Sequence, residues 1–311
     1  MRRLLTSILC FSAFAVLPPA ALADGGPAPG VSVGWPGLAA RGVHYVAAPS
    51  RDGTEVEVVR NGHALPLRER TIQGSYGIPI VTWDGHTDGL SADGRTLVLE
   101  NVRAPSVRLQ RESGFAVLDA RTLVLEQRVS LRGDFTFDAL SPDGRTLYLI
   151  EHVSSQNLTL YRVRAYDVRA RRLLRRIIAE KGSWQTATMA GWPITRAVSR
   201  DGIWVYTLYG RNDRGAPFVH ALDARDRTAV CLDVSWRGDQ NDLWQIRLRV
   251  DEPRERLLLH DDISGRTVAV LRIPASADQQ RAETSRKPVL FAVAGGFLIA
   301  LLAIGVLRLR R

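Results

Sequence analysis

A short motif that occurs in three copies constrains the fold of this chain more than any other feature. It consists of Ser-x-Asp-Gly and a following apolar run, and its copies lie at residues 90–100, 140–151 and 198–208. A glycine after the aspartate accepts the positive φ of a tight turn, and the run of aliphatic, β-branched and aromatic residues is typical of a strand. Each copy is therefore predicted to form a strand, a tight turn and a second strand.

A second hairpin pattern follows each of these turns. An aspartate ends an apolar run and is followed by a turn and another apolar stretch at Asp119, Asp167 and Asp223. An aspartate in this position bonds backbone amides ahead of it in an Asx-turn, which is a structural role. The serines of the first motif lie 50 and 58 residues apart, and the aspartates of the second lie 48 and 56 apart. One repeating unit is therefore two hairpins, or four strands.

Four antiparallel strands repeated at this period are typical of the blade of a β-propeller. Less regular strand and turn patterns flank the clear repeats, at residues 43–67 on one side and 245–271 on the other. The sequence therefore predicts an all-β fold, a β-propeller of about five to six four-stranded blades. Closure of the ring by strands from both ends of the chain would remove the exposed sheet edges.

The stretch Ser141-Pro-Asp-Gly-Arg-Thr-Leu-Tyr, followed by Tyr166-Asp167 and its hairpin, resembles the repeat of the YVTN-type and lactonase-type β-propellers. The resemblance covers roughly residues 85–235, and its motifs are specific for the fold. Lactonase-type enzymes use polar residues at the mouth of the central channel. Those residues have no match here position by position, so the resemblance implies no catalytic residue.

The N-terminus carries an export pattern. Arg2 and Arg3 precede an apolar core from Leu4 to Leu17, and Ala21-Leu22-Ala23 offers a small-x-small cleavage site. A charged start, an apolar middle and such a site are typical of a secretory signal peptide, so we predict cleavage after Ala23.

The C-terminus carries a membrane-anchor pattern. The segment from Val289 to Leu307 is apolar and uncharged over nineteen residues, which is enough to cross a bilayer as a helix. With the signal peptide, this predicts a type I single-pass protein of the plasma membrane whose body is extracytoplasmic. The expected domains are a signal peptide (1–23), a flexible lead-in (24–30), the β-propeller (31–274), a polar stalk (275–287), a transmembrane helix (288–307) and a cytoplasmic tail (308–311).

Charge and cysteine content exclude some classes of function. The formal net charge is +10, but five of the arginines lie at the two ends of the chain, and no basic run forms an arm. We therefore expect no nucleic-acid binding. Cys10 lies in the predicted leader without a lipobox, which leaves Cys231 as the one thiol of the mature chain and no internal disulfide.

The best candidate for a ligand site lies at the mouth of the channel. Asp88, Asp138 and Arg196 each precede the turn serine of their repeat by three residues, and His86 lies close by. Because they take the same slot in successive blades, these side chains are expected to converge at the centre. Two carboxylates and a guanidinium suit a polar ligand or a cation. The alternative, which we favour, is that they bond to one another and to water.

Four tryptophans offer a second candidate surface. They lie in two irregular stretches, at Trp184 and Trp192 and at Trp236 and Trp244. Tryptophans in connecting loops are typical of partner-binding surfaces, and they also cover the apolar ends of blades. The sequence leaves both interpretations open.

Signals for catalysis or cofactors are weak. The six histidines lack metal-binding spacing apart from His260-Asp261-Asp262, which favours a turn rich in acceptors. We therefore expect no metal, no cofactor and a monomer. The favoured function is a membrane-anchored binding or scaffold module for an envelope protein, polymer or small ligand. The alternative is a propeller-type hydrolase or lactonase with its site at the channel mouth.

Overall fold

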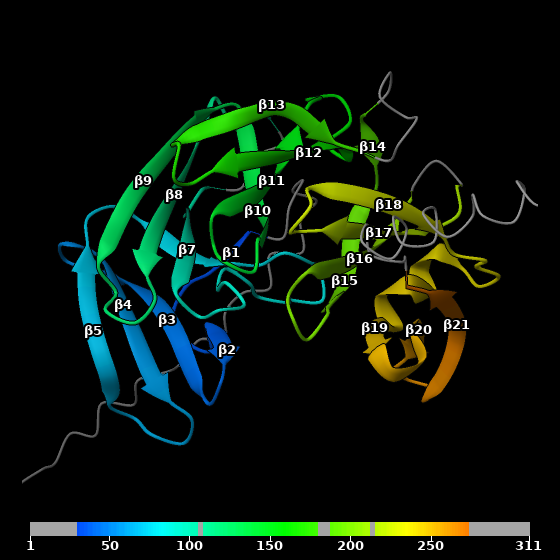
Figure 1. The fold of residues 1–311 in the computed structure, drawn as a ribbon, viewed down its shortest axis with the longest axis horizontal. Coiled ribbons are helices and arrows are strands. Elements are labelled where there is room, and N and C mark those ends of the chain that lie inside the picture. The colour runs from blue at the N-terminus through cyan, green and yellow to red at the C-terminus, as the bar shows by residue number, and fades with distance from the viewer. Residues whose placement is uncertain (1–29, 105–107, 180–186, 212–214, 274–311) are drawn as a thin grey trace, which may run out of the picture.

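The computed structural model describes residues 30–104, 108–179, 187–211 and 215–273. Over these ranges the chain folds almost entirely into β-strands, which form five antiparallel sheets that follow one another in chain order (Figure 1). Within this part of the chain, no helix is long and apolar enough to cross a membrane. Several predicted features lie outside the described residues: the signal peptide, the stalk, the transmembrane helix, the tail and Trp184.

The first two of the five sheets contain the strands at the N-terminal end of the described chain. The first sheet contains β2 (Leu38–Ala40), β3 (Val43–Ser50), β4 (Gly53–Arg60) and β5 (Pro66–Ile72). The second contains β6 (Tyr76–Pro79), β7 (Thr96–Asn101), β8 (Glu112–Asp119) and β9 (Leu125–Arg132), with the short β1 (Val31–Ser32) paired to β6.

The remaining three sheets continue the same pattern. The third contains β10 (Asp134–Leu140), β11 (Thr146–His152), β12 (Leu160–Asp167) and β13 (Arg172–Ile178), and the two-residue β14 (Met189–Ala190) pairs with β12. The fourth contains β15 (Trp192–Val198), β16 (Trp204–Gly210), β17 (Phe218–Asp223) and β18 (Thr228–Asp233). The fifth has three described strands, β19 (Ile246–Asp251), β20 (Arg256–Asp261) and β21 (Arg266–Arg272). The predicted all-β architecture of antiparallel, mostly four-stranded blades is confirmed.

The Ser-x-Asp-Gly turns are held by the same set of bonds in each blade. In the third blade the Ser141 hydroxyl donates to Asp143 Oδ1 (2.7 Å) and accepts the Thr146 amide (2.9 Å). Gly144 has a φ of 69°, and a Cβ there would lie 2.2 Å from Thr96 Oγ1 of the second blade. The equivalent serines, Ser91 and Ser199, each donate to an aspartate at 2.6 Å. The turn residues are therefore required both by the local conformation and by the close approach of the neighbouring blade.

Replacing Ser141 with alanine is expected to lower the free energy of unfolding by about 1–2 kcal/mol, because the Thr146 amide and Asp143 lose their partner. Urea denaturation of the purified protein, followed by tryptophan fluorescence, measures this loss. Ser50→Ala is the matched control, since within the described residues the buried Ser50 hydroxyl has no hydrogen-bond partner. Equal effects of the two substitutions would contradict the role given to the turn.

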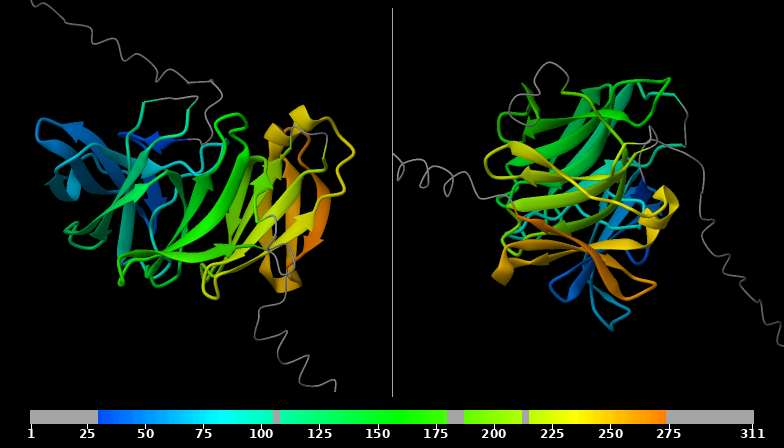
Figure 2. Two further views of the ribbon diagram at one scale, coloured as in Figure 1. Left: turned by 90° about the horizontal axis from the view of Figure 1, so that it is seen from above. Right: turned by 90° about the vertical axis from the view of Figure 1, so that its right-hand side faces the viewer.

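Apolar residues are packed between successive blades. Four buried clusters join the first blade to the second, the second to the third, the third to the fourth and the fourth to the fifth. Among the described residues, no such cluster joins the fifth blade to the first. These two blades lie at opposite ends of the longest dimension of the molecule (Figures 1 and 2). The blades therefore form an open arc, and the N-terminal β1 joins the second blade and not the fifth.

Candidate functional site

Three side chains from successive blades meet at the inner edge of the arc. Arg196 on β15 has a side chain that is only 1% exposed, and its Nη2 forms an ion pair with Asp138 on β10. Its Nη1 lies 3.5 Å from Asp88 Oδ2, and its Nε donates to Thr207 Oγ1 at 3.1 Å. Asp88, Asp138 and Arg196, which lie three residues before the turn serines of their blades, are therefore close together in the structure. Ligand binding by them stays a prediction.

The backbone around Asp138 and Arg196 is strand. Residues 134–138 and 192–196 form most of β10 and β15. In β10, Asp134, Thr136 and Asp138 alternate with two phenylalanines, which is the period of a strand. All seven residues of β10 are buried, so the polar side of the strand faces protein and not open solvent.

The electrostatics of this centre favour mutual neutralisation. Burial lowers the pKa of Arg196, but the carboxylates of Asp138 and Asp88 outweigh that effect and raise it. Burial raises the pKa of Asp88, more than the Arg196 guanidinium lowers it. The guanidinium is therefore permanently charged and fully engaged with groups of its own chain. The arrangement matches the interpretation in which these residues bond to one another.

The stretch from Trp83 to Asp88, which leads into the first clear repeat, forms a loop across the inner edge, and its contacts with more distant blades were not predicted from the sequence. Ile80 and Thr87 are bridged to each other, and residues 81–86 project between them. The Trp83 and Asp84 amides donate to the carbonyls of Pro193 (2.9 Å) and Ile194 (3.1 Å), which extends the edge of β15. This loop therefore connects the second blade directly to the fourth.

The same loop reaches the fifth blade. The Trp83 ring packs edge-on against Trp244 with a centroid distance of 6.1 Å, and Asp84 Oδ2 lies 3.8 Å from Arg247 Nε. Both contacts hold the last blade to the centre of the arc. The loop thus occupies part of the space that an open channel would need.

An open cavity of about 570 Å³ lies beside this loop, and we refer to it as the axial bowl. Its polar lining includes His86 and Asp88, two of the predicted site residues, whereas Asp138 and Arg196 do not line it. The rest of the wall comes from the first four blades: residues 38–41, 85, 87, 90–92, 139–140, 198–200, 202 and 205. Asp138 instead lines a separate cavity of about 20 Å³, room for about one water molecule.

The axial bowl combines apolar walls with charged groups. Leu38, Leu90 and Leu140 line it together with Val198, which is 38% exposed. Arg200 also lines it, with a side chain that is 90% exposed and 3.7 Å from Glu252. Such a mixture of apolar surface and a few polar groups is typical of a ligand-binding cavity.

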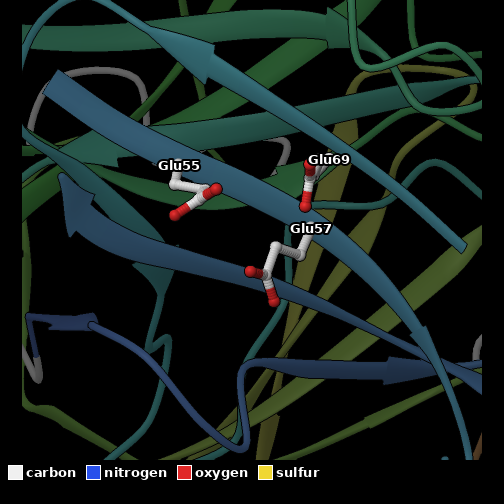
Figure 3. Close-up of side chains that lie close together, drawn as sticks. All are labelled: Glu55, Glu57 and Glu69. Atoms are coloured by element: carbon white, nitrogen blue, oxygen red, sulfur yellow. The ribbon is translucent and has the colours of Figure 1, made fainter. Parts of the chain in front are cut away.

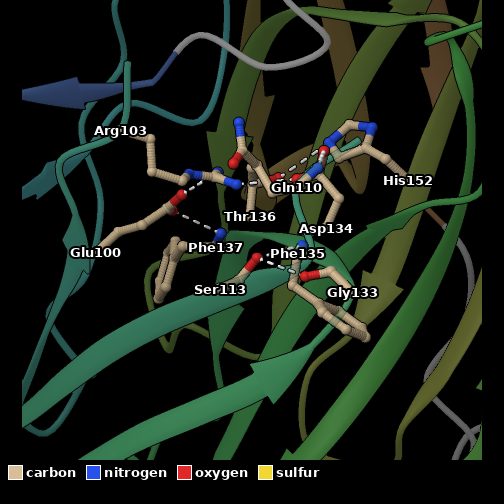
Figure 4. A network of polar contacts seen from close by, with 10 residues as sticks. All are labelled: Glu100, Arg103, Gln110, Ser113, Gly133, Asp134, Phe135, Thr136, Phe137 and His152. Atoms are coloured by element: carbon tan, nitrogen blue, oxygen red, sulfur yellow. Dashed lines mark hydrogen bonds and ion pairs between the residues drawn. The ribbon is translucent and has the colours of Figure 1, made fainter. Parts of the chain in front are cut away.

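A second buried ionic network connects the second and third blades (Figure 4). Arg103 pairs with Glu100 (2.6 Å) and with Asp134 (2.9 Å), and Glu100 also accepts the Phe137 amide at 2.9 Å. Burial raises the pKa of Glu100 to about 7, against the lowering effect of Arg103. Sequence analysis missed this network, because Glu100 and Arg103 look in the sequence like ordinary charged residues at the end of a strand.

The four predicted tryptophans have different surroundings. Trp184 lies outside the described residues. Trp192 belongs to β15 and not to a loop, and it packs with Trp236 against the core between the fourth and fifth blades. Trp244 lies in the short 3₁₀ helix η2 (Gln240–Gln245) and is 46% exposed. Of the three predicted tryptophans that the structure describes, Trp244 presents the most surface to solvent, and partner binding through it stays a prediction.

Two groups of acidic residues bear on a metal site. His260 and Asp261 end β20 and Asp262 begins the turn after it, where Asp261 accepts the amides of Ile263 (2.9 Å) and Ser264 (3.1 Å). One cluster of three carboxylates occurs in the described part of the chain, formed by Glu55, Glu57 and Glu69 (Figure 3). It lies on the first blade, away from the axial bowl, and the sequence analysis did not identify it.

No protein-family model and no curated protein matches the chain. Similar solved structures include Kuenenia stuttgartiensis hydrazine synthase, at 18% identity and a TM-score of 0.35, with 60% of this chain and 48% of that chain covered. The Swd1 β-propeller domain of Myceliophteria thermophila is 14% identical, with a TM-score of 0.39 and coverage of 76% and 64%. Citrobacter koseri AztD is 12% identical, with a TM-score of 0.32 and coverage of 75% and 60%.

The chain spans between about half and two thirds of the length of these proteins. At such identities and TM-scores, no activity, ligand or partner is carried over to this chain. The propeller-like blade architecture rests on the five consecutive antiparallel sheets of the chain itself.

Proposed function

We propose that the chain is an exported, membrane-anchored β-propeller that works as a binding module, with the axial bowl as its ligand site. The observation that carries this proposal is the bowl itself, about 570 Å³ in volume, with apolar walls beside His86, Asp88 and exposed arginines. The anchor and the export signal rest on the sequence patterns at the two ends. An envelope protein that offers an extended segment to the bowl is the partner we favour.

The charges at the rim define the chemistry of that segment. Arg41 and Arg200 line the bowl and are exposed. Among the described residues that line the bowl, Asp88 is the one with a carboxylate. A carboxylate of the ligand is expected to pair with these guanidinium groups, since such pairs are charge-assisted and directional. Apolar side chains of the ligand would cover the leucines and Val198. The expected ligand is therefore an acidic peptide segment with apolar anchors.

Peptide selection followed by affinity measurement tests this proposal. A displayed library of short peptides is selected on the full chain held in lipid nanodiscs, and the selected peptides are then titrated against variants. Val198→Asp and Arg200→Glu are each expected to weaken binding about tenfold or more. Arg51→Glu, at an exposed turn of the first blade outside the bowl, is the control and leaves affinity unchanged. Selected peptides without acidic residues, or equal affinities for all variants, would contradict the proposal.

The alternative is a propeller-type hydrolase or lactonase at the same mouth. It is tested by measuring turnover on a panel of lactones with the wild-type chain and with Asp88→Asn. Turnover that is lost in this variant would support the enzyme and overturn the binding module. Absence of turnover together with selective peptide binding would support the module.

A further inference from the structure

The open arc leaves one face of the first blade without a neighbouring blade. On β4, Val56 and Val58 point into the core shared with the second blade, so the alternating Glu55 and Glu57 lie on the opposite face. Glu57 is directly opposite Glu69 of β5 in the ladder. We call the surface formed by Glu55, Glu57, Glu69 and the exposed Leu67 the acidic end face.

The carboxylates of the acidic end face repel one another. One carboxylate oxygen from each of the three residues lies within 4.8 Å of the other two, and Figure 3 shows the three side chains close together. Like charges directly opposite in a ladder destabilise a sheet. Partial burial raises the pKa of Glu57, and the negative charges of Glu55 and Glu69 raise it further. In the described part of the chain these three carboxylates make no ion pair. The face therefore carries unneutralised negative charge.

The fifth blade has the opposite arrangement on its free face. Leu257 and Leu259 of β20 are buried against the fourth blade, which places Arg256 and Leu258 on the other side. Arg256 is directly opposite Arg272 of β21, and Leu258 is opposite Val270. Two like charges again face each other across the ladder.

The free face of the fifth blade exposes charged and apolar side chains to solvent. Arg249 of β19 is directly opposite Leu258, and its side chain is 59% exposed. Val268 and Val270 are 45% and 50% exposed. Asp251 pairs with Arg256 at 2.7 Å and Asp262 pairs with Arg249 at 3.7 Å, and both offset part of the charge, whereas Arg272 forms no ion pair within the described residues. We call the surface formed by Arg249, Arg256, Leu258, Val270 and Arg272 the basic end face.

We propose that the acidic end face of one copy of this chain binds the basic end face of a second copy. Each face carries a pair of like charges beside exposed apolar side chains, and the two faces have opposite sign, so association relieves repulsion on both. One chain cannot make this contact with itself, because its end blades lie at opposite ends of the molecule (Figures 1 and 2). The contact joins different surfaces of two copies, so it builds a closed ring or an open row of copies. It replaces the expectation of a monomer.

Sedimentation of the full chain in nanodiscs or mild detergent tests the contact. The wild-type chain is expected to associate with increasing concentration, and added salt weakens association because exposed charges are screened. Glu69→Arg and Arg272→Glu are each expected to weaken association about tenfold or more. Each new side chain lies opposite an unlike charge in its own ladder, at Glu57 or Arg256, so neither variant is expected to lose thermal stability. Unchanged stability with lost association is a result that misfolding does not produce.

A control and a rescue complete the test. Glu126→Arg, on the exposed side of β9 and outside both end faces, is expected to leave association unchanged. A chain with Glu57→Arg and Glu69→Arg, mixed with one carrying Arg249→Glu and Arg272→Glu, is expected to regain association between the two.

Several results would overturn the proposal. These are a wild-type chain that stays monomeric up to roughly 100 µM, end-face variants that associate like the wild type, and mixed variants that stay apart. Dissociation of the wild type by EDTA would also overturn it, because the carboxylates would then hold a divalent cation and not the arginines of a second copy.

Discussion

Replacing Arg196 with methionine is expected to lower the free energy of unfolding by about 3–5 kcal/mol. The side chains of Arg196 and Asp138 are 1% and 5% exposed, so the substitution leaves a carboxylate buried without its cation. It also removes the bond from Nε to Thr207. Methionine keeps most of the apolar volume of the arginine stem. The decrease in the free energy of unfolding is therefore due mainly to the missing charge. Urea denaturation of the purified protein at neutral pH measures it.

A double-mutant cycle separates the charge from the packing. Asp138→Leu alone leaves the buried guanidinium with the more distant Asp88 as its one carboxylate partner in the described structure, and is also expected to destabilise the protein. The double variant with Arg196→Met recovers much of the loss, because a buried ion pair replaced by apolar groups is often neutral. Arg145→Met is the surface control: its pair with Asp143 is 73% and 55% exposed, and its loss costs about 1 kcal/mol or less. Equal costs at Arg196 and Arg145 would show that the central pair is not buried in solution.

The blade architecture could be predicted because its signals are local. A Ser-x-Asp-Gly turn and the apolar run after it lie within a dozen residues, and they correspond to the turns that end at β7, β11 and β16. The meeting of Asp88, Asp138 and Arg196 followed from the same repeat, since equivalent positions in successive blades lie near the centre. The second, third and fourth blades, which carry these motifs, are the ones that the sequence describes best.

The parts that could not be predicted depend on contacts between distant residues. The loop at residues 81–86 is held by carbonyls of Pro193 and Ile194, more than a hundred positions away, and no repeat connects them. The pair of Arg103 with Asp134 crosses from one blade to the next. The open arc itself is a property of the first and last blades, whose sequences depart furthest from the repeat.

The end faces show why strand register is needed as well as strand pattern. Glu55 and Glu57 in the sequence look like the solvated side of an ordinary strand. Only the pairing of Glu57 with Glu69 reveals three carboxylates in one place. A one-residue slip of β5 would place Glu69 on the other face of the sheet. The proposed contact between copies is therefore an inference that the sequence alone did not support.

Acid is expected to destabilise the wild-type chain through His220. Its ring is 3% exposed, neither ring nitrogen has a hydrogen-bond partner in the described structure, and Tyr209 packs edge-on at 6.4 Å. Burial lowers its pKa from 6.5 to about 4. Between these values the folded state binds fewer protons than the unfolded state. The stabilisation is therefore complete above pH 6.5 and is lost as the pH falls toward 4, by about 3 kcal/mol.

The difference between His220→Leu and the wild type isolates this effect. Leucine does not titrate, so the stability of the variant relative to the wild type is expected to rise by about 3 kcal/mol between pH 7 and pH 4. Chemical denaturation at each pH measures the difference. A constant difference across this range would contradict the assignment, because it would mean that His220 titrates alike in the folded and unfolded chains.

For Glu100→Gln, the stability of the variant relative to the wild type is expected to change with pH in the opposite direction to that of His220→Leu. Burial raises the Glu100 pKa from 4.5 to about 7, so the folded state binds the extra proton, and stability from this group is lost as the pH rises between these values. The wild-type profile combines both groups, and their slopes cancel in part where the two ranges overlap. Two difference profiles of opposite sign, each measured against the wild type, are therefore the expected result. A flat difference profile for either variant would mean that its side chain titrates in contact with water, and profiles of the same sign would mean that one of the two pKa values shifts in the opposite direction.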